Sequence, residues 1–62
     1  MLGDTGAIQE GKAAGALGLK VTDNPYRKAL SVPEVYTDDR AYGRYVALAL
    51  CWESGFIYGK KA

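Results

Sequence analysis

The stretch Tyr45 to Trp52, Tyr-Val-Ala-Leu-Ala-Leu-Cys-Trp, carries apolar side chains on every face of the helix that it forms. Arg44 and Glu53 bound it, and it is far shorter than the roughly 18 residues that a membrane-spanning helix needs. It is therefore a core or interface helix. A chain of 62 residues buries only about 60% of the surface of its unfolded state, so one face of this helix is expected to need a partner.

The helix that contains this stretch is expected to run from about 37 to 58. Asp38 and Asp39 suit its start, where the helix dipole is positive, and Gly59 followed by two lysines suits its end. A stripe of mainly aromatic side chains at helical spacing predicts the core-facing side: Tyr42, Tyr45, Ala49, Trp52 and Phe56. A neighbouring apolar stripe carries Val46, Leu50 and Ile57.

A first helix is expected from about 4 to 20, with Asp4 or Thr5 as its N-cap. Alanines favour this helix, but each interior glycine costs about 1 kcal/mol relative to alanine. Three of these glycines share one face at helical spacing, in a stripe made of Ile8, Gly11, Gly15 and Gly18. A stripe without side chains predicts that another backbone or a large aromatic ring approaches closely there.

The connector, residues 21–36, is expected to be partly helical. Asn24 suits an N-cap and Pro25 the first position of a short helix, whereas Pro33 opens another turn. The chain as a whole, 1–62, predicts one all-α domain. We expect an antiparallel two-helix hairpin with a long connector, assembled as a homo-oligomer.

Composition excludes several classes of site. The chain has no histidine and one cysteine, so neither an internal disulfide nor the usual zinc sites can form. Cys51, between Leu50 and Trp52, is expected to be a buried and inert thiol. Asp38 and Asp39 favour helix capping over acid-base chemistry. We therefore expect no enzyme activity, no metal and no cofactor, and the absence of a signal-peptide pattern favours the cytoplasm.

Two clusters combine tyrosine with basic side chains, a combination that suits stacking on bases or anchoring a protein interface. The candidate binding residues are Tyr26, Arg27, Lys28, Arg40, Arg44 and Tyr45. The alternative is that Tyr45 belongs to the core and that the arginines form a solvated face. Eight basic and seven acidic residues give a net charge of +1, too balanced for a protein that grips nucleic acid mainly through phosphates.

Three segments together resemble the ribosome modulation factor family of small two-helix bacterial proteins: residues 10–18 with their glycines and alanines, Asn24-Pro25-Tyr26, and Trp52-Glu53-Ser54-Gly55-Phe56. The residues that carry the resemblance are Gly11, Gly15, Gly18, Pro25, Tyr26, Trp52, Gly55 and Phe56. The resemblance implies that glycines of the first helix admit aromatic side chains of the second. It also implies ribosome binding near the messenger-RNA path and translational silencing. The stretch between Tyr26 and Trp52 is longer than in that family, and the charge is less basic.

Two functions remain open on the sequence. The first is a non-catalytic binding module that binds ribosomes, ribosomal RNA or another protein. The second is a homo-oligomeric phage or bacterial counter-defence protein that sequesters a nucleotide-like small molecule or inhibits a partner protein by inserting its apolar helix. Neither involves a membrane.

Overall fold

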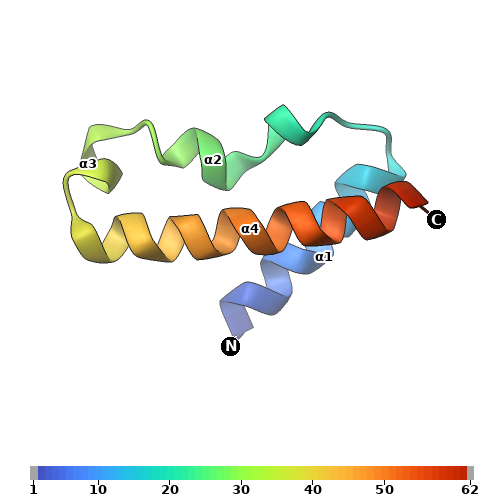
Figure 1. Ribbon diagram of the computed structural model, residues 1–62, viewed down its shortest axis with the longest axis horizontal. Coiled ribbons are helices and arrows are strands. Elements are labelled where there is room, and N and C mark those ends of the chain that lie inside the picture. The colour runs from blue at the N-terminus through green and yellow to red at the C-terminus, as the bar shows by residue number, and fades with distance from the viewer. Residues whose placement is uncertain (1, 62) are drawn as a thin grey trace.

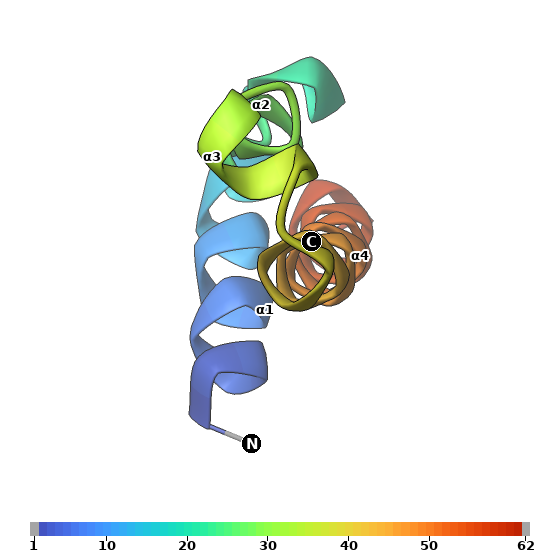
Figure 2. The same cartoon turned by 90° about the vertical axis from the view of Figure 1, so that its left-hand side faces the viewer.

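The structure, a computed structural model, describes the backbone of residues 2–61 and the side chains of residues 6–61. Every regular element of the described residues is a helix, which confirms the all-α prediction. Its elements are α1 (Leu2–Ala16), the 3-10 turn η1 (Val21–Asp23), α2 (Pro25–Ala29), α3 (Pro33–Tyr36) and α4 (Asp39–Lys61). The longest helix, α4, is crossed obliquely by α1 on one side and covered by α2 and α3 on another (Figures 1 and 2).

The two long helices do not form the expected antiparallel hairpin. The contacts between them advance in the same direction along both helices: Ile8 lies against Gly55, and Gly15 lies against Lys60. The C-terminal ends of α1 and α4 are therefore on the same side of the molecule. The reason is the connector, which leaves the end of α1, runs back along α4 through α2 and α3, and reaches the opposite end before α4 begins (Figure 1).

Glycines of α1 let the two helices touch backbone to backbone. Gly11 faces the carbonyl group of Trp52, and Gly15 faces the backbone of Phe56. A Cβ atom at either glycine would approach a backbone atom of α4 closer than 3.0 Å, a separation that real Cβ atoms essentially never show. The predicted close approach is confirmed at these two positions, and what approaches Gly11 and Gly15 is the backbone of α4.

Glycines of α4 complete the same crossing from the other side. Gly55 lies against the carbonyl of Ile8, and Gly59 lies against the carbonyl of Lys12. A Cβ atom would again come closer than 3.0 Å in both places. The expectation that Gly59 ends the helix is wrong, because α4 continues to Lys61. Gly59 packs against α1, and α4 continues through it because this contact outweighs the tendency of glycine to end a helix.

Gly18 ends α1 and takes no part in the crossing. Its φ of 79° lies in the left-handed region that favours glycine. The Gly18 amide donates to the carbonyl of Gly15 at 3.1 Å, and the Leu19 amide donates to that of Ala14 at 3.0 Å. This pair of bonds is a Schellman motif, which stops α1 at Ala16, four residues before the expected end. α1 also begins before the expected caps Asp4 and Thr5, whose side chains lie outside the described ones.

The core is small and lies where α1, α2 and α4 meet. Ala14, Trp52 and Phe56 form it, and Tyr26 packs against it. The Trp52 and Phe56 rings stack with their centroids 5.2 Å apart, as one-turn neighbours on a helix can. Of the predicted core stripe, Ala49 is also buried, whereas Tyr42 is 46% exposed.

The beginnings of α2 and α4 follow the predicted capping pattern. The Asn24 side chain accepts from the amide of Tyr26, with Pro25 in the first turn of α2. Asp38 accepts from the amides of Arg40 and Ala41 and so caps α4. No helix within residues 2–61 is both long enough and apolar enough to cross a membrane.

Candidate functional site

One stripe of α4 faces away from the rest of the molecule along its whole length. Its members follow one another at steps of three or four residues and are exposed without exception: Arg40, Arg44, Ala47, Leu50, Ser54, Ile57 and Lys61. We call this set the outer stripe. Residues at this spacing share one face of a helix, so the outer stripe is a continuous surface with an apolar middle and basic ends.

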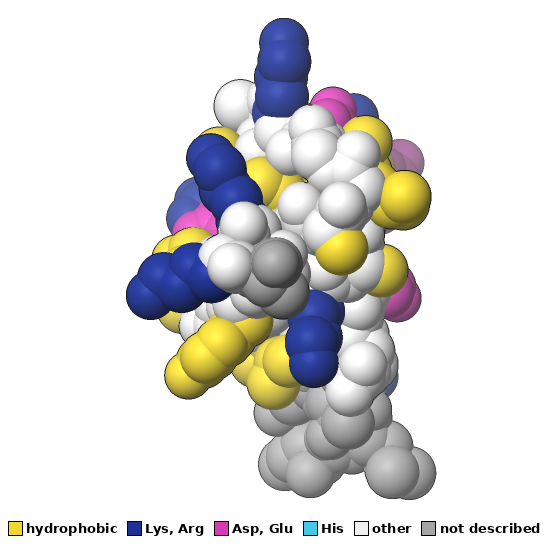
Figure 3. All heavy atoms as spheres, turned by 90° about the vertical axis from the view of Figure 1, so that its right-hand side faces the viewer, with side chains coloured by type: hydrophobic (Ala, Val, Ile, Leu, Met, Phe, Trp, Pro, Cys, Tyr) yellow, Lys and Arg dark blue, Asp and Glu magenta, His cyan; other side chains and the backbone are white. Residues whose placement is uncertain are grey.

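Large apolar side chains are held in solvent on this stripe and beside it. Leu50 is 54% exposed, Ile57 is 55% exposed and the neighbouring Tyr58 is 70% exposed. Seen from the C-terminal end of α4, hydrophobic side chains project from the outer side of the helix with basic side chains close by (Figure 3). These exposures agree with the prediction that the chain alone leaves one apolar face of this helix uncovered, and the structure shows that this face carries Leu50 and Ile57.

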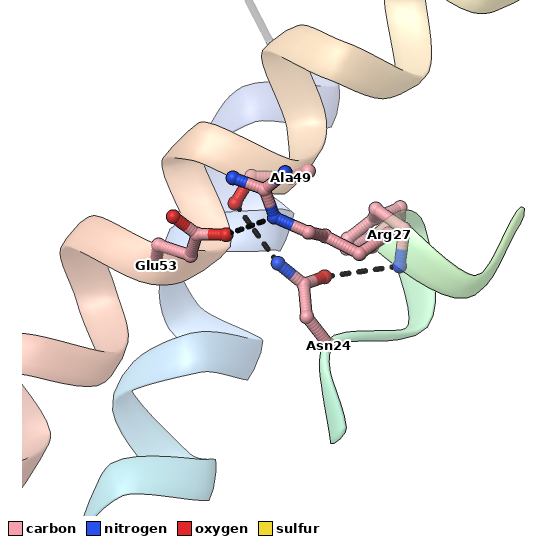
Figure 4. Close-up of polar contacts among 5 residues, drawn as sticks. Asn24, Arg27, Ala49 and Glu53 are labelled. Atoms are coloured by element: carbon pink, nitrogen blue, oxygen red, sulfur yellow. Dashed lines mark hydrogen bonds and ion pairs between the residues drawn. The ribbon is translucent and has the colours of Figure 1, made fainter. Parts of the chain in front are cut away.

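The chain's other elements occupy the remaining sides of α4. α1 takes the side of Gly55 and Gly59, as described above. The connector takes another side through Asn24, whose Nδ2 donates to the carbonyl oxygen of Ala49 at 3.0 Å (Figure 4). Neither contact reaches the outer stripe.

Asn24 anchors the connector with both ends of its amide. The side chain is fully buried. Its Oδ1 accepts from the Tyr26 amide at 3.0 Å, and its Nδ2 reaches Ala49 in α4 (Figure 4). A buried amide with both groups satisfied fixes position, because loss of either bond leaves a polar atom without a partner. Asn24 thus joins the cap of α2 to the middle of α4.

An ion pair strengthens the same attachment at the surface. Arg27 Nε donates to Glu53 Oε2 (Figure 4). The hydrogen bond from Arg27 holds the pKa of the Glu53 carboxyl below its usual value, against the opposing effect of burial. The same bond raises the pKa of Arg27. Arg27 therefore gives its Nε to the fold, while its side chain remains 54% exposed.

Tyr26 joins the connector to both long helices. Its hydroxyl donates to Glu10 Oε1 of α1 at 3.0 Å, and its ring lies 6.4 Å from the ring of Tyr45 in α4, centroid to centroid. Burial raises the pKa of Tyr26, and the hydrogen bond to Glu10 raises it further. These contacts are those of a structural residue at the junction of three helices.

The candidate binding residues therefore separate into two places. The structure brings Tyr26 and Tyr45 together, beside the ion-paired Arg27. Lys28 is exposed in α2, on the connector side. Arg40 and Arg44 lie instead on the outer stripe. A single surface of tyrosines and arginines does not form, because Tyr45 turns toward the connector whereas Arg44, one residue earlier, turns away from it.

Sequence reasoning missed that these arginines share a face with Leu50 and Ile57. The signal was available in the spacing, since steps of four, three and three residues lead from Arg40 through Arg44 and Ala47 to Leu50. The prediction placed the two arginines with the adjacent Tyr45 in one binding cluster, and this hid the spacing that they share with Leu50. Lys61, at the other end of the stripe, was assigned only to the helix dipole.

The remaining candidate groups of the sequence, Cys51 and the adjacent pair of aspartates, lie apart from each other. Cys51 is partly buried, less so than expected. Asp38 uses its carboxylate to cap α4. No cluster of cysteine, aspartate and glutamate able to hold a metal ion occurs in that part of the chain. The surface chemistry of the outer stripe is that of exposed apolar and cationic side chains.

The chain matches no protein-family model, no curated protein and no solved structure.

Proposed function

We propose that the protein is a non-catalytic binding module that resembles ribosome modulation factor and binds the ribosome or another macromolecule through its outer stripe. The observation that carries this proposal is the exposure of Leu50 and Ile57, each more than half exposed on one face of the longest helix. α1 and the connector occupy the other sides of that helix through specific backbone and amide contacts.

The chemistry of the stripe suits macromolecular recognition. Contiguous apolar side chains rimmed by polar ones mark interaction surfaces more often than isolated exposed residues do. Tyrosine and arginine are enriched among the residues that dominate binding energy, and Tyr58, Arg40 and Arg44 border or belong to the stripe. A helix with an exposed apolar face is also a common means of docking into a groove of a partner.

The ribosomal form of the proposal draws on the resemblance of the glycine segment, of Asn24-Pro25-Tyr26 and of Trp52 to Phe56 to that family. Its test is co-sedimentation with bacterial ribosomes. We expect binding at low salt that weakens steeply as salt is raised, since cations on the protein would replace counterions of ribosomal RNA. Absence of binding at low salt would eliminate the ribosomal form.

A pair of leucine variants tests the surface itself. Leu50→Asp places a charge in the middle of the stripe and is expected to abolish binding, because an interface would then bury an unpaired carboxylate. Leu17→Asp makes the same change at an exposed leucine of similar size, 77% exposed and outside the stripe, and should leave binding intact. Equal losses in the two variants would show that the stripe is not the binding surface.

Self-assembly is the competing use of the same stripe, and it belongs to the alternative of a homo-oligomer that holds a nucleotide-like ligand. Native mass spectrometry distinguishes the two. A discrete oligomer with retained small molecules would favour the alternative, whereas a monomer without ligands would exclude it.

A further inference from the structure

We propose that the partner of the outer stripe is an acidic amphipathic helix of another protein, with an apolar middle and carboxylates toward both of its ends. This inference rests on the proposed function and specifies the partner. It is carried by two properties of the stripe, the spacing of its apolar residues and the position of its charges.

The middle of the stripe has the shape that packs against a helix. Ala47 and Ser54 alternate with the larger Leu50 and Ile57 at steps of three, four and three residues. Small residues between large ones leave recesses that side chains of a facing helix can fill. Over the whole stripe, from Arg40 to Lys61, 21 residues in six steps give an average step of 3.5, which keeps those recesses in line with a partner that crosses at a shallow angle. At 1.5 Å per residue the middle is roughly 15 Å long, so a partner segment of about three turns would cover it.

Charge is positive at both ends of this apolar middle. Arg40 and Arg44 precede it and Lys61 follows it, and all three are exposed. Within residues 6–61 the structure pairs Arg27 with Glu53 and gives these three cations no carboxylate partner. Asp39 lies next to Arg40 and offers one negative charge, while Asp38 is occupied with the amides at the start of α4. The stripe therefore presents an excess of positive charge to whatever covers it.

A second copy of the chain is a poor partner for the outer stripe, because its own stripe carries the same excess of positive charge. If two outer stripes packed in parallel, arginines would face arginines and lysine would face lysine. If they packed antiparallel, Arg40 and Arg44 of each copy would face Lys61 of the other. Like charges across an interface disfavour pairing, and this holds in either orientation, so charge complementarity selects a partner that carries carboxylates at both ends.

The test uses the intact protein and three synthetic helical peptides of about 18 residues, a length that permits helix formation. All three carry the same leucine stripe, and the residues at both ends are glutamate, glutamine or lysine. Affinity is measured by fluorescence anisotropy at low and at physiological salt. We expect the glutamate peptide to bind at least tenfold more tightly than the glutamine peptide, the lysine peptide to bind most weakly, and salt to reduce these differences.

Charge reversal in the protein provides the decisive control. The double variant Arg40→Glu, Arg44→Glu should lower the affinity for the glutamate peptide at least tenfold and raise that for the lysine peptide. It should still fold, because glutamate is a good helix former at both positions and acidic residues are favoured in the first turn, where position 40 lies; circular dichroism checks this. Leu50→Asp should remove binding of all three peptides.

Several outcomes would overturn the inference. Equal affinity for the glutamate and glutamine peptides would leave the proposed function standing but refute the acidic partner. Failure of the glutamate peptide to bind would refute it also, with ribosome co-sedimentation then deciding the proposed function independently. Tighter binding of a uridine oligonucleotide would assign the stripe to nucleic acid, and a dimer abolished by Leu50→Asp would assign it to a second copy.

Discussion

Gly55 of α4 lies directly against the backbone carbonyl of Ile8 in α1, with no side chain between the two helices. Gly11, Gly15 and Gly59 make equivalent contacts. Because this crossing uses backbone surface, the core of the protein needs only a few large side chains. It also leaves the opposite face of α4 free of any role in holding α1.

Replacement of Gly55 by alanine should destabilise the protein. The new Cβ atom would overlap the Ile8 carbonyl, and relief requires the helices to separate at a cost of about 1–3 kcal/mol, more than the gain of up to about 1 kcal/mol in helix propensity. Gly43→Ala is the matched control in the same helix, because nothing lies within 4 Å of its Cβ position. Thermal unfolding should show a lower Tm for Gly55→Ala and a higher Tm for Gly43→Ala. A rise in both would contradict the close crossing.

Asn24→Ala should destabilise the protein by about 1–3 kcal/mol, because the change removes the cap of α2 and leaves the buried site without its bond to Ala49. Asp38→Ala is the comparison. Asp38 also caps a helix, but its side chain bonds only the amides at that helix end. Its loss is therefore expected to cost about 1 kcal/mol. Urea unfolding measures both. Equal costs would mean that the bond to Ala49 adds nothing.

Acid should weaken the protein in part through Glu53. Its pKa is lower in the folded state than in the unfolded chain because Arg27 donates to it. The contribution is therefore complete above the ordinary glutamate pKa of about 4.3 and is lost as pH falls through the lower, folded value. Glu53→Gln should remove this part of the pH dependence. The difference in stability between wild type and variant should then shrink as pH is lowered toward 2, and a constant difference would refute the role of the ion pair.

High pH should also lower the stability of the protein, in part through Tyr26, whose pKa is shifted upward instead of downward. Its pKa is raised in the folded state by burial and by the bond to Glu10. The associated stability is therefore complete below the ordinary tyrosine pKa of about 10 and falls as pH rises through the higher, folded value. Tyr26→Phe should unfold with a weaker dependence on pH between about 9 and 12. Absorbance of tyrosinate, followed with unfolding, checks this, and identical profiles in both proteins would contradict it.

Local signals predicted much of this fold. Asn24 and Pro25 predicted the start of α2, and the aspartates at 38 and 39 the start of α4, because capping depends on neighbouring residues only. The close approach at Gly11 and Gly15 followed from the cost of glycine in a helix. An uncovered apolar face followed from the number of apolar faces on α4, and the structure shows that it carries Leu50 and Ile57.

These local signals could not predict the relative direction of the helices or which residues of one helix contact another. The course of the connector set the relative direction of α1 and α4, and no local pattern encodes that course. Gly18 and Gly59 exchanged their expected roles: Gly18 stops a helix, whereas Gly59 packs inside one. A glycine near a helix end carries the same signal in both cases, and only the neighbouring helix decides between them. For the same reason the sequence did not show that Arg40 and Arg44 lie on a different face of α4 from Tyr45.

We propose the outer stripe as the surface that other macromolecules bind. The most direct test places the photo-cross-linking residue p-benzoylphenylalanine at Ser54, in the middle of the stripe, or at Lys28, exposed on the connector side. Both proteins are irradiated in a bacterial extract that contains ribosomes. We expect a discrete cross-linked product from position 54 and none from position 28. No product from position 54, or a product from position 28 alone, would contradict it.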